Sequence, residues 1–74
     1  MEARRVRLLY PPALVNTPVI HQLIKKFDIT INILKAEIDP DQGWVELMVS
    51  GDQDTIEKAI GWLNTQGIEV EAIR

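Results

Sequence analysis

Few side chains in this chain could carry out chemistry, and no set of them has the composition of a catalytic or metal site. There is no cysteine, which excludes disulfides, thiolate catalysis and cysteine-ligated zinc or iron–sulfur clusters. The single histidine, His21, has no acidic residue at metal-ligand spacing on the helix expected there. Ser50 and Thr55 have no nearby base that could activate a hydroxyl group as a nucleophile. We therefore expect a protein that is not an enzyme and that holds no metal or other cofactor.

One amide side chain stands out from its surroundings. Asn32 lies within the segment Ile29–Asp39, ITINILKAEID, among isoleucine and leucine residues. The β-branched residues and the alternation of this segment predict a strand. Because its first half is apolar on both faces, the strand has more apolar surface than one side of a sheet can bury. The position of this strand in the sheet therefore decides what the side chain of Asn32 can contact.

Length and composition indicate one small globular domain, residues 1–74. The chain has 74 residues, of which 46% are hydrophobic and 26% charged, and its net charge is −3. The acidic balance opposes binding to nucleic acid or anionic membranes, and no apolar run approaches the ~20 residues of a membrane-spanning helix. The N-terminal segment, MEARRVRLLYPP, lacks the apolar core of a signal peptide. We expect a cytoplasmic protein, and a domain this small without disulfides often gains stability as a dimer.

Hydrophobic periodicity predicts four strands and two helices. Apolar residues recur at every second position in the strands and at spacings of three and four in the helices. Thr17 and Pro18 have the residue types that cap and begin the first helix. Ser50 or Asp52 can cap the second helix, and Gly67 can end it. The expected strands are Arg4–Tyr10, Ile29–Ile38, Trp44–Ser50 and Ile68–Ile73, with one helix between the first two and one between the last two.

The order of these elements, β-α-β-β-α-β, predicts an α+β fold of the ferredoxin-like, split βαβ type. With right-handed crossovers, the four strands form an antiparallel sheet in the order 4-1-3-2, and both helices cover one face. Charge supports this order, because it places arginines of the first strand between glutamates of the third and fourth. The residues concerned are Arg5 and Arg7, Glu46, and Glu69 and Glu71.

The second strand lies at an edge of this sheet, and its two halves conflict. One arrangement turns the polar side chains of the second half to solvent, so that the residues facing the helices are Asn32, Leu34, Ala36 and Ile38. The alternative is a β-bulge near Ile33–Leu34, which turns the isoleucines of the first half toward the helices. In both arrangements the edge is more apolar than a monomer should expose, so we expect a second copy or a ligand to cover it. The predicted interface consists of Ile29, Ile31, Ile33, Trp44 and Met48.

The sequence around Asn32 resembles the signature of the NIL domain family. The motif is Asn32-Ile33-Leu34, which follows a helix and the residues Phe27-Asp28-Ile29. The resemblance spans residues 4–73 and agrees with the fold predicted above. Further matches are Gly43-Trp44-Val45, Gly51, Ala59-Ile60 with Leu63, and Gly67-Ile68 with Val70-Glu71.

The resemblance implies a regulatory, amino-acid-binding function. NIL domains occur at the C-terminus of the ATPase subunit of methionine importers, which are ABC transporters. There two copies pair through their sheets and bind methionine, which restrains transport. Carried over by position, the family's pocket implies ligand-binding roles for Tyr10, Asn32, Leu34 and Ile38. The amide would bind the ammonium or carboxylate group of the ligand, and the apolar side chains would enclose a thioether.

Two departures from the importer leave the partner open. The chain contains no phosphate-binding loop, GxxxxGK[ST], and therefore no ATPase. The run PVIHQLIKKF is similar to a second NIL branch, which is fused to iron–sulfur ferredoxin domains and associated with sulfur assimilation. The expected function is thus amino-acid sensing by a homodimer, with methionine as the ligand. The alternative is an adaptor module without a small ligand, which docks on a transporter or on a sulfur-metabolism protein.

Overall fold

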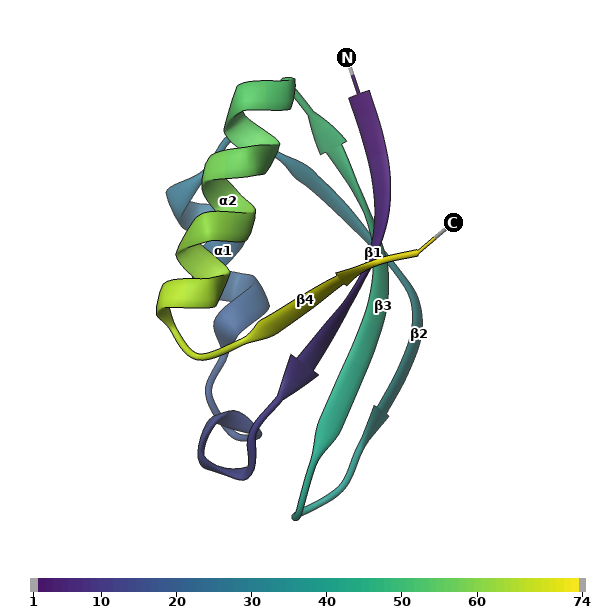
Figure 1. The fold of residues 1–74 in the computed structure, drawn as a ribbon, viewed down its shortest axis with the longest axis vertical. Coiled ribbons are helices and arrows are strands. Elements are labelled where there is room, and N and C mark those ends of the chain that lie inside the picture. The colour runs from purple at the N-terminus through teal and green to yellow at the C-terminus, as the bar shows by residue number, and fades with distance from the viewer. Residues whose placement is uncertain (1, 74) are drawn as a thin grey trace.

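The elements of the computed structural model, which describes residues 2–73, follow the expected order (Figure 1). A short 3₁₀ helix between the first strand and the first helix was not expected from the sequence. None of the helices within residues 2–73 is long and apolar enough to cross a membrane. The elements are β1 (Glu2–Tyr10), η1 (Pro12–Leu14), α1 (Val19–Lys26), β2 (Thr30–Ile38), β3 (Gly43–Gly51), α2 (Gln53–Thr65) and β4 (Glu69–Ala72).

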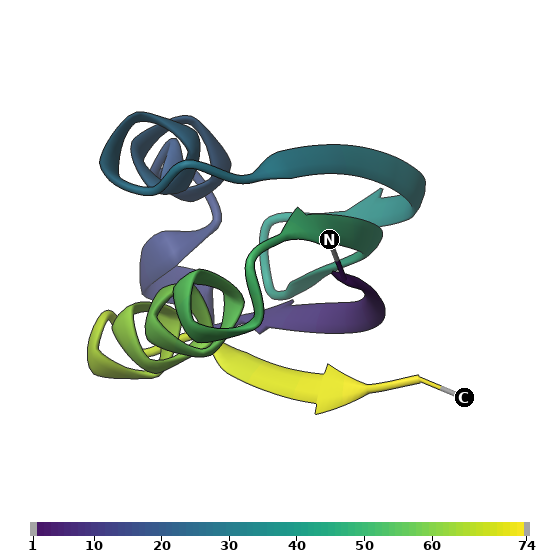
Figure 2. The same cartoon turned by 90° about the horizontal axis from the view of Figure 1, so that it is seen from above.

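The four strands form one antiparallel sheet in the order β2-β3-β1-β4. This is the predicted order 4-1-3-2, read from the opposite edge. Both helices cover the same face of the sheet, as the view from above shows (Figure 2). The α+β, ferredoxin-like fold predicted from the sequence is therefore confirmed.

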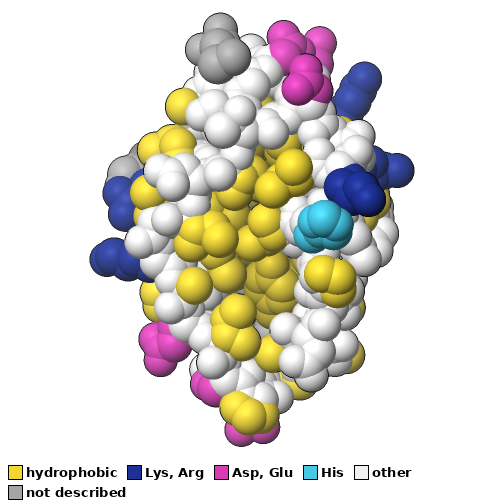
Figure 3. All heavy atoms as spheres, turned by 180° about the vertical axis from the view of Figure 1, so that it is seen from behind, with side chains coloured by type: hydrophobic (Ala, Val, Ile, Leu, Met, Phe, Trp, Pro, Cys, Tyr) yellow, Lys and Arg dark blue, Asp and Glu magenta, His cyan; other side chains and the backbone are white. Residues whose placement is uncertain are grey.

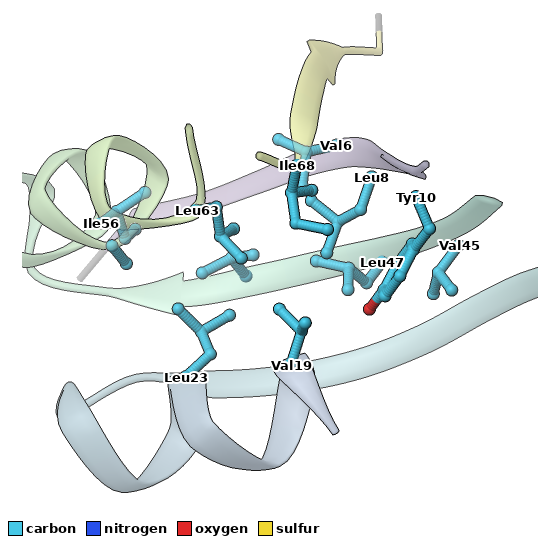
Figure 4. Close-up of a cluster of buried hydrophobic side chains, with 12 residues drawn as sticks. Val6, Leu8, Tyr10, Val19, Leu23, Val45, Leu47, Ile56, Leu63 and Ile68 are labelled. Carbon is cyan, nitrogen blue, oxygen red and sulfur yellow. The ribbon is translucent and has the colours of Figure 1, made fainter. Parts of the chain in front are cut away.

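The hydrophobic core lies between the sheet and the helices (Figure 4). Side chains alternate between the two faces along each strand, so every second residue of β1 and β3 faces the helices. Paired residues share a face, and the pairs Val6–Leu47 and Leu8–Val45 lie on the helix side. Full burial of a leucine or isoleucine contributes roughly 1.5–3 kcal/mol to folding. The buried residues are Val6, Leu8, Tyr10, Val19, Leu23, Val45, Leu47, Val49, Ile56, Ala59, Leu63 and Ile68.

The C-terminal end of α2 is closed by a Schellman motif around Gly67, the residue that the sequence predicts there. The N–H of Ile68 donates to the carbonyl oxygen of Leu63 at 3.0 Å, and the N–H of Gly67 donates to that of Asn64 at 3.1 Å. Gly67 has φ of 93°, a left-handed conformation that glycine adopts without strain. The chain can therefore turn directly from α2 into β4.

The predicted side-chain caps are absent from the N-termini of both helices. The carbonyl oxygen of Thr17 accepts the N–H of Val19 at 2.8 Å, so α1 begins one residue later and Pro18 occupies the N-cap position. Asp52, one of the two candidates that the sequence offers, is the N-cap of α2, but its side chain makes no capping hydrogen bond. The start of α1 was therefore predicted one residue too early, the start of α2 agrees with one of the two predicted caps, and neither predicted capping hydrogen bond forms.

A β-bulge lies in β2, where the sequence leaves two arrangements open. The register with β3 shifts between Ile33 and Lys35, so Leu34 is the extra residue. Before the shift, Ile33 pairs with Leu47, which is fully buried on the helix side. The isoleucines of the first half therefore face the helices, and the arrangement that places them on the open face is wrong.

After the bulge the alternation resumes with the opposite parity. Ala36 pairs with the core residue Val45 and faces the helices, whereas Lys35 faces the open side. In the first half, Asn32 lies opposite Met48 on the open face of the sheet. Of the two arrangements left open, the bulge near Ile33–Leu34 is the one observed, and the arrangement that turned Asn32 toward the helices is wrong.

Candidate functional site at the edge strand

An apolar groove of about 230 Å³ opens between α1 and β2. Residues of α1 and β2 form its two walls, and β1 and β3 contribute residues between them. Figure 3 shows this side of the molecule, where yellow apolar side chains surround a hollow with the histidine (cyan) beside it. The main lining residues are Val19, Ile20 and His21 of α1, Ile33, Ala36 and Ile38 of β2, Tyr10 of β1 and Val45 of β3.

The groove exists because α1 is too short to cover the whole of β2. α1 has eight residues, and the ribbon of β2 and β3 continues past it (Figure 1). The large hydrophobic side chains that are most exposed within residues 2–73 all belong to these two elements. They are Ile24 (47% exposed), Ile33 (54%), Leu34 (40%) and Ile38 (54%). Exposed apolar side chains gathered on one surface typically mark a ligand or protein contact.

Tyr10 contributes a hydroxyl group to this groove. The residue is only 7% exposed, and its oxygen points toward the space between Val19 and β2 (Figure 4). Burial raises the pKa of Tyr10 above its ordinary value of 10.0, because the charged form is desolvated. The side-chain hydrogen bonds within residues 2–73 do not involve this hydroxyl. It is therefore free to donate to, or accept from, a bound group.

The four predicted ligand-binding residues do not form one cluster. Tyr10 and Ile38 both line the groove, which agrees with their places at the ends of parallel strands. Leu34 is the bulge residue and is 40% exposed. Asn32 lies on the open face, because its neighbours in the strand occupy the helix side. Two of the four residues therefore share the groove, and the edge strand separates Asn32 from them.

The predicted interface residues also divide between the two faces of the sheet. Ile29 and Ile31 are partly buried and pack against the core, whereas Ile33 is 54% exposed. Trp44 and Met48 are half-buried on the open face. Of these five residues, Ile33 is the one that lines the groove.

The contribution of α1 to the groove was missed at the level of sequence. The apolar spacing predicts that Ile20 packs on the sheet, and His21 is expected in a solvated or rim position; both also line the groove together with Val19, which was not predicted. Element length is the signal that could have revealed this. Eight helical residues extend ~12 Å, whereas nine residues of a strand extend ~30 Å, so one end of β2 has to remain uncovered.

The open face of the sheet has a different chemistry, built around Glu46. Its carboxylate accepts hydrogen bonds from Arg7 at 2.5 Å and from Arg5 at 3.2 Å, and its side chain is only 6% exposed. The guanidinium carbon of Arg7 also lies 5.0 Å from the ring centroid of Trp44. The hydrogen bond from Arg7, aided by Arg5, lowers the pKa of Glu46 against the opposing effect of burial. Because Glu46 is engaged by both arginines, we assign the cluster to the fold rather than to a ligand site; within residues 2–73 the buried Nε of Arg7 is left without a hydrogen-bond partner.

Comparison with models of known protein families identifies the family of this domain. The family model described as "NIL domain" matches residues 4–72. The chain belongs to the NIL domain family. This confirms the resemblance that rests on Asn32-Ile33-Leu34 and on the matches elsewhere in the chain.

Relatives of this NIL domain are parts of longer proteins. One is the L-aspartate semialdehyde sulfurtransferase iron-sulfur subunit of Methanocaldococcus jannaschii, 42% identical over 59 residues, which are 80% of this chain and 44% of the relative. Another is the methionine import ATP-binding protein MetN of Coxiella burnetii, 31% identical over 72 residues, which are 92% of this chain and 20% of the relative. The chain thus spans less than half the length of either relative.

A solved structure shares the fold of the NIL domain. It is the C-terminal domain of an ABC transporter ATP-binding protein from Enterococcus faecalis, with a TM-score of 0.83 over 95% of this chain and 82% of that chain. The sequence identity is 23%, so this likeness concerns the fold alone.

Proposed function

We propose that this NIL domain binds methionine or a related sulfur amino acid in the groove between α1 and β2, and that two copies meet at or near this groove. The observation that carries the proposal is an apolar groove into which the hydroxyl of Tyr10 points. In this proposal the domain is a cytoplasmic regulator, which acts through ligand-linked association and not through catalysis.

The size and lining of the groove support a small apolar amino acid as the ligand. Its volume of about 230 Å³ lies below the ~300–1,000 Å³ of pockets that enclose drug-sized molecules. Ile20 and Ile38 offer apolar contacts to a thioether side chain, and Tyr10 offers a hydrogen bond to an ammonium or carboxylate group. The names of the relatives support a sulfur compound, because one is named for methionine import and another for sulfur transfer.

The position of Asn32 separates two forms of this proposal: the ligand lies either in the groove or on the open face of the sheet. Its side chain is on the open face, so it could contact a ligand only from that side of the edge strand. If the amino acid lies in the groove, substitution of Tyr10 should weaken binding more than substitution of Asn32. If the amino acid lies on the open side of a contact between two copies, the order should be reversed.

The test is calorimetric titration with L-methionine and with homocysteine. Tyr10→Phe removes the hydroxyl but keeps the ring, and should weaken binding in the groove about 10- to 150-fold, because a hydrogen bond to a charged group contributes roughly 1.5–3 kcal/mol. Asn32→Ala tests the open face. Asn64→Ala, which removes an exposed amide from α2, is the matched control and should leave affinity unchanged.

Thermal unfolding gives an independent reading of the same binding. Ligand at 100 times its Kd should stabilise the fold by about 2.7 kcal/mol. No heat of binding and no rise in melting temperature at millimolar methionine and homocysteine would refute the amino-acid proposal.

A second candidate function is that of an adaptor that docks a transporter or sulfur-metabolism protein without any small ligand. The observation that favours it is the concentration of exposed apolar side chains on α1 and β2, which resembles a protein-contact surface. The affinity of a protein partner, measured with and without methionine, distinguishes the sensor from the adaptor. A partner that binds this surface with the same affinity in saturating methionine and in its absence supports the adaptor.

A further inference from the structure

The first turn of α1 leaves two backbone N–H groups without an acceptor. The N–H of Val19 donates to a loop carbonyl oxygen at 2.8 Å, and the N–H of Gln22 donates to the carbonyl oxygen of Pro18 at 3.1 Å. Between them, the N–H groups of Ile20 and His21 have no hydrogen-bond acceptor in the described part of the chain. Pro18, at the N-cap, has no side-chain atom that could accept them. Such N–H groups point out of the helix end, where the aligned peptide dipoles favour a negative charge.

This end of α1 borders the groove. All five residues from Thr17 to His21 line it, whereas residues 22–26 of the helix do not. The hydroxyl of Tyr10 points into the same space (Figure 4), although the residue is 93% buried and the hydroxyl is unpaired within residues 2–73. Burial raises the pKa of Tyr10, so the hydroxyl keeps its proton at neutral pH and can donate it in a hydrogen bond. Two kinds of hydrogen-bond donor therefore face one cavity.

The groove offers no matching charge for an amino group. The side chains that line it include no aspartate or glutamate, and the first turn of α1 contains no acidic residue. An ammonium group that leaves water without a counter-charge loses hydration and gains little in return. The positive end of the helix dipole also repels a cation. The lining is therefore suited to an acid group and not to an amine.

We propose that the N-terminus of α1 and the hydroxyl of Tyr10 form a carboxylate-binding site in the groove. The ligand is then recognised by its acid group and its apolar tail, and its amino group is dispensable. The N–H groups of Ile20 and His21 and the hydroxyl of Tyr10 donate to the carboxylate oxygens, in the way that helix N-termini bind anions. Asn32, on the open face, has no part in this site. The inference rests on the proposed function, because it assumes that the ligand lies in the groove, and it names the group that the groove recognises.

Two analogues of methionine separate the acid group from the amino group. Methylthiobutanoate is methionine without its amino group and should bind within about threefold of methionine. Methylthiopropylamine is methionine without its carboxyl group and should bind about a hundredfold more weakly or less, because it loses several charge-assisted hydrogen bonds. Tyr10→Phe should weaken the binding of both acids by the same factor, since the hydroxyl contacts the group that they share. Isothermal titration calorimetry at neutral pH measures all three compounds.

Pro18→Asp tests the helix end directly. The new carboxylate would accept the N–H of Ile20 or His21 and so occupy the site from within the chain. Pro18→Ala also removes the proline but supplies no acceptor. Compared with Pro18→Ala, Pro18→Asp should have a melting temperature about 4–8 °C higher without ligand. It should also bind methylthiobutanoate about tenfold more weakly. Misfolding cannot produce this result, because stability rises while affinity falls.

Two further variants exclude other causes. Lys25→Gln changes the net charge by the same amount as Pro18→Asp, but at the other end of α1 and outside the groove, and should leave the affinity for methylthiobutanoate unchanged. His21→Ala removes the imidazole at the rim of the groove (Figure 3) and keeps the backbone N–H. A greater loss of acid binding in His21→Ala than in Pro18→Asp would assign recognition to the imidazole and overturn the helix-end site.

The outcomes distinguish this inference from the proposal of an amino-acid ligand. Binding of methionine with a loss of about tenfold or more for methylthiobutanoate overturns the inference and leaves the proposed function standing. Binding of methylthiobutanoate without binding of methionine supports the acid site and overturns the amino-acid proposal alone. Methylthiopropylamine that binds as tightly as methionine, or an unchanged affinity in Pro18→Asp, overturns the inference alone. No binding of any of the three compounds at millimolar concentration overturns both.

Discussion

Glu46 accepts a hydrogen bond from Arg7 at 2.5 Å on the face of the sheet that the helices leave open. This bond holds the pKa of Glu46 below its ordinary value of 4.5, so the folded state binds a proton less readily than the unfolded chain. The stability that the contact contributes is fully present above pH 4.5, the ordinary value of the carboxyl group. It is lost as the pH falls through the lower pKa of the folded state.

Replacing Glu46 should therefore change the pH dependence of stability. Glu46→Gln should lower the free energy of unfolding at neutral pH, because Arg5 and Arg7 lose their shared carboxylate. It should also reduce the loss of stability between about pH 5 and pH 2. Urea unfolding across this range measures both effects. Glu71→Gln, exposed on β4, controls for the removal of one negative charge, and an acid dependence that is the same in both variants would contradict the prediction.

Gly61 offers a stabilising substitution. It is exposed within α2, and a methyl group at this position would meet no atom within 4 Å beyond its chain neighbours and the adjacent backbone of the helix itself. Gly61→Ala should raise the free energy of unfolding by about 0.5–1 kcal/mol, because alanine loses less conformational freedom in a helix. Urea unfolding with an unchanged m-value would verify this. A decrease in stability would indicate that another surface packs closely on this part of α2.

The same substitution at Gly67 should have the opposite sign. Its φ of 93° is unfavourable for any residue with a Cβ atom, and that atom would lie 3.4 Å from Cδ1 of Leu14. Gly67→Ala should lower the free energy of unfolding by about 1–2 kcal/mol. Gly61→Ala is its matched control, since both add one methyl group to a glycine near α2. Equal effects at the two positions would mean that the Schellman motif does not determine the end of α2.

Leu23 and Ile24 separate the stability of the single chain from the contact between copies. They are neighbours in α1, but Leu23 is 1% exposed and Ile24 is 47% exposed. Leu23→Ala should lower the free energy of unfolding by about 2–5 kcal/mol through the cavity that it leaves. Ile24→Ala should change it by about 0.5 kcal/mol or less, while weakening association between copies. Unfolding at low concentration and sedimentation at high concentration measure the two effects, and a large loss of monomer stability in Ile24→Ala would contradict the assignment.

The fold could be predicted because its signals are local. The alternation of Val6 and Leu8, the apolar spacing in both helices and the break at Gly67 each act within a few residues. The element order then leaves few topologies, and the arginines of β1 select among them. The hydroxyl of Thr17 failed as a cap because one backbone hydrogen bond delays the helix by a residue, which residue type alone does not encode.

The site could be predicted only in part, because it depends on which face each residue occupies. Tyr10 and Ile38 were expected at one end of the sheet, and both line the groove. The face of Asn32 stayed open between two arrangements, because a single extra residue, Leu34, reverses the parity of the residues before it. Packing of β2 against β3 and α1 decides between the two parities, and no spacing within the strand contains that information.

The bulge also leads to a prediction about chain length. Deleting Leu34 joins Ile33, which faces the helices, directly to Lys35, which faces the open side. The strand then alternates regularly without a bulge, and every apolar residue keeps its face. Deleting Ala36 instead joins Lys35 to Glu37, so that one charged side chain must turn toward the apolar groove on the helix side, or the residues before the deletion must exchange faces.

The two deletions should therefore differ sharply although each removes one residue from the same strand. Loss of the partly exposed Leu34 should change the free energy of unfolding by about 1 kcal/mol or less. Loss of Ala36 should cost more, about 1.5–3 kcal/mol, because a strand that keeps both charged residues on the open face has to turn Ile31 away from the core against which it packs. Cross-strand contacts between the amides of β2 and β3, observed by nuclear magnetic resonance, should show the present pairs on both sides of the Leu34 deletion. If that deletion unfolds the domain while the Ala36 deletion does not, the extra residue is required for the packing of the edge strand and the regular alternation is not sufficient.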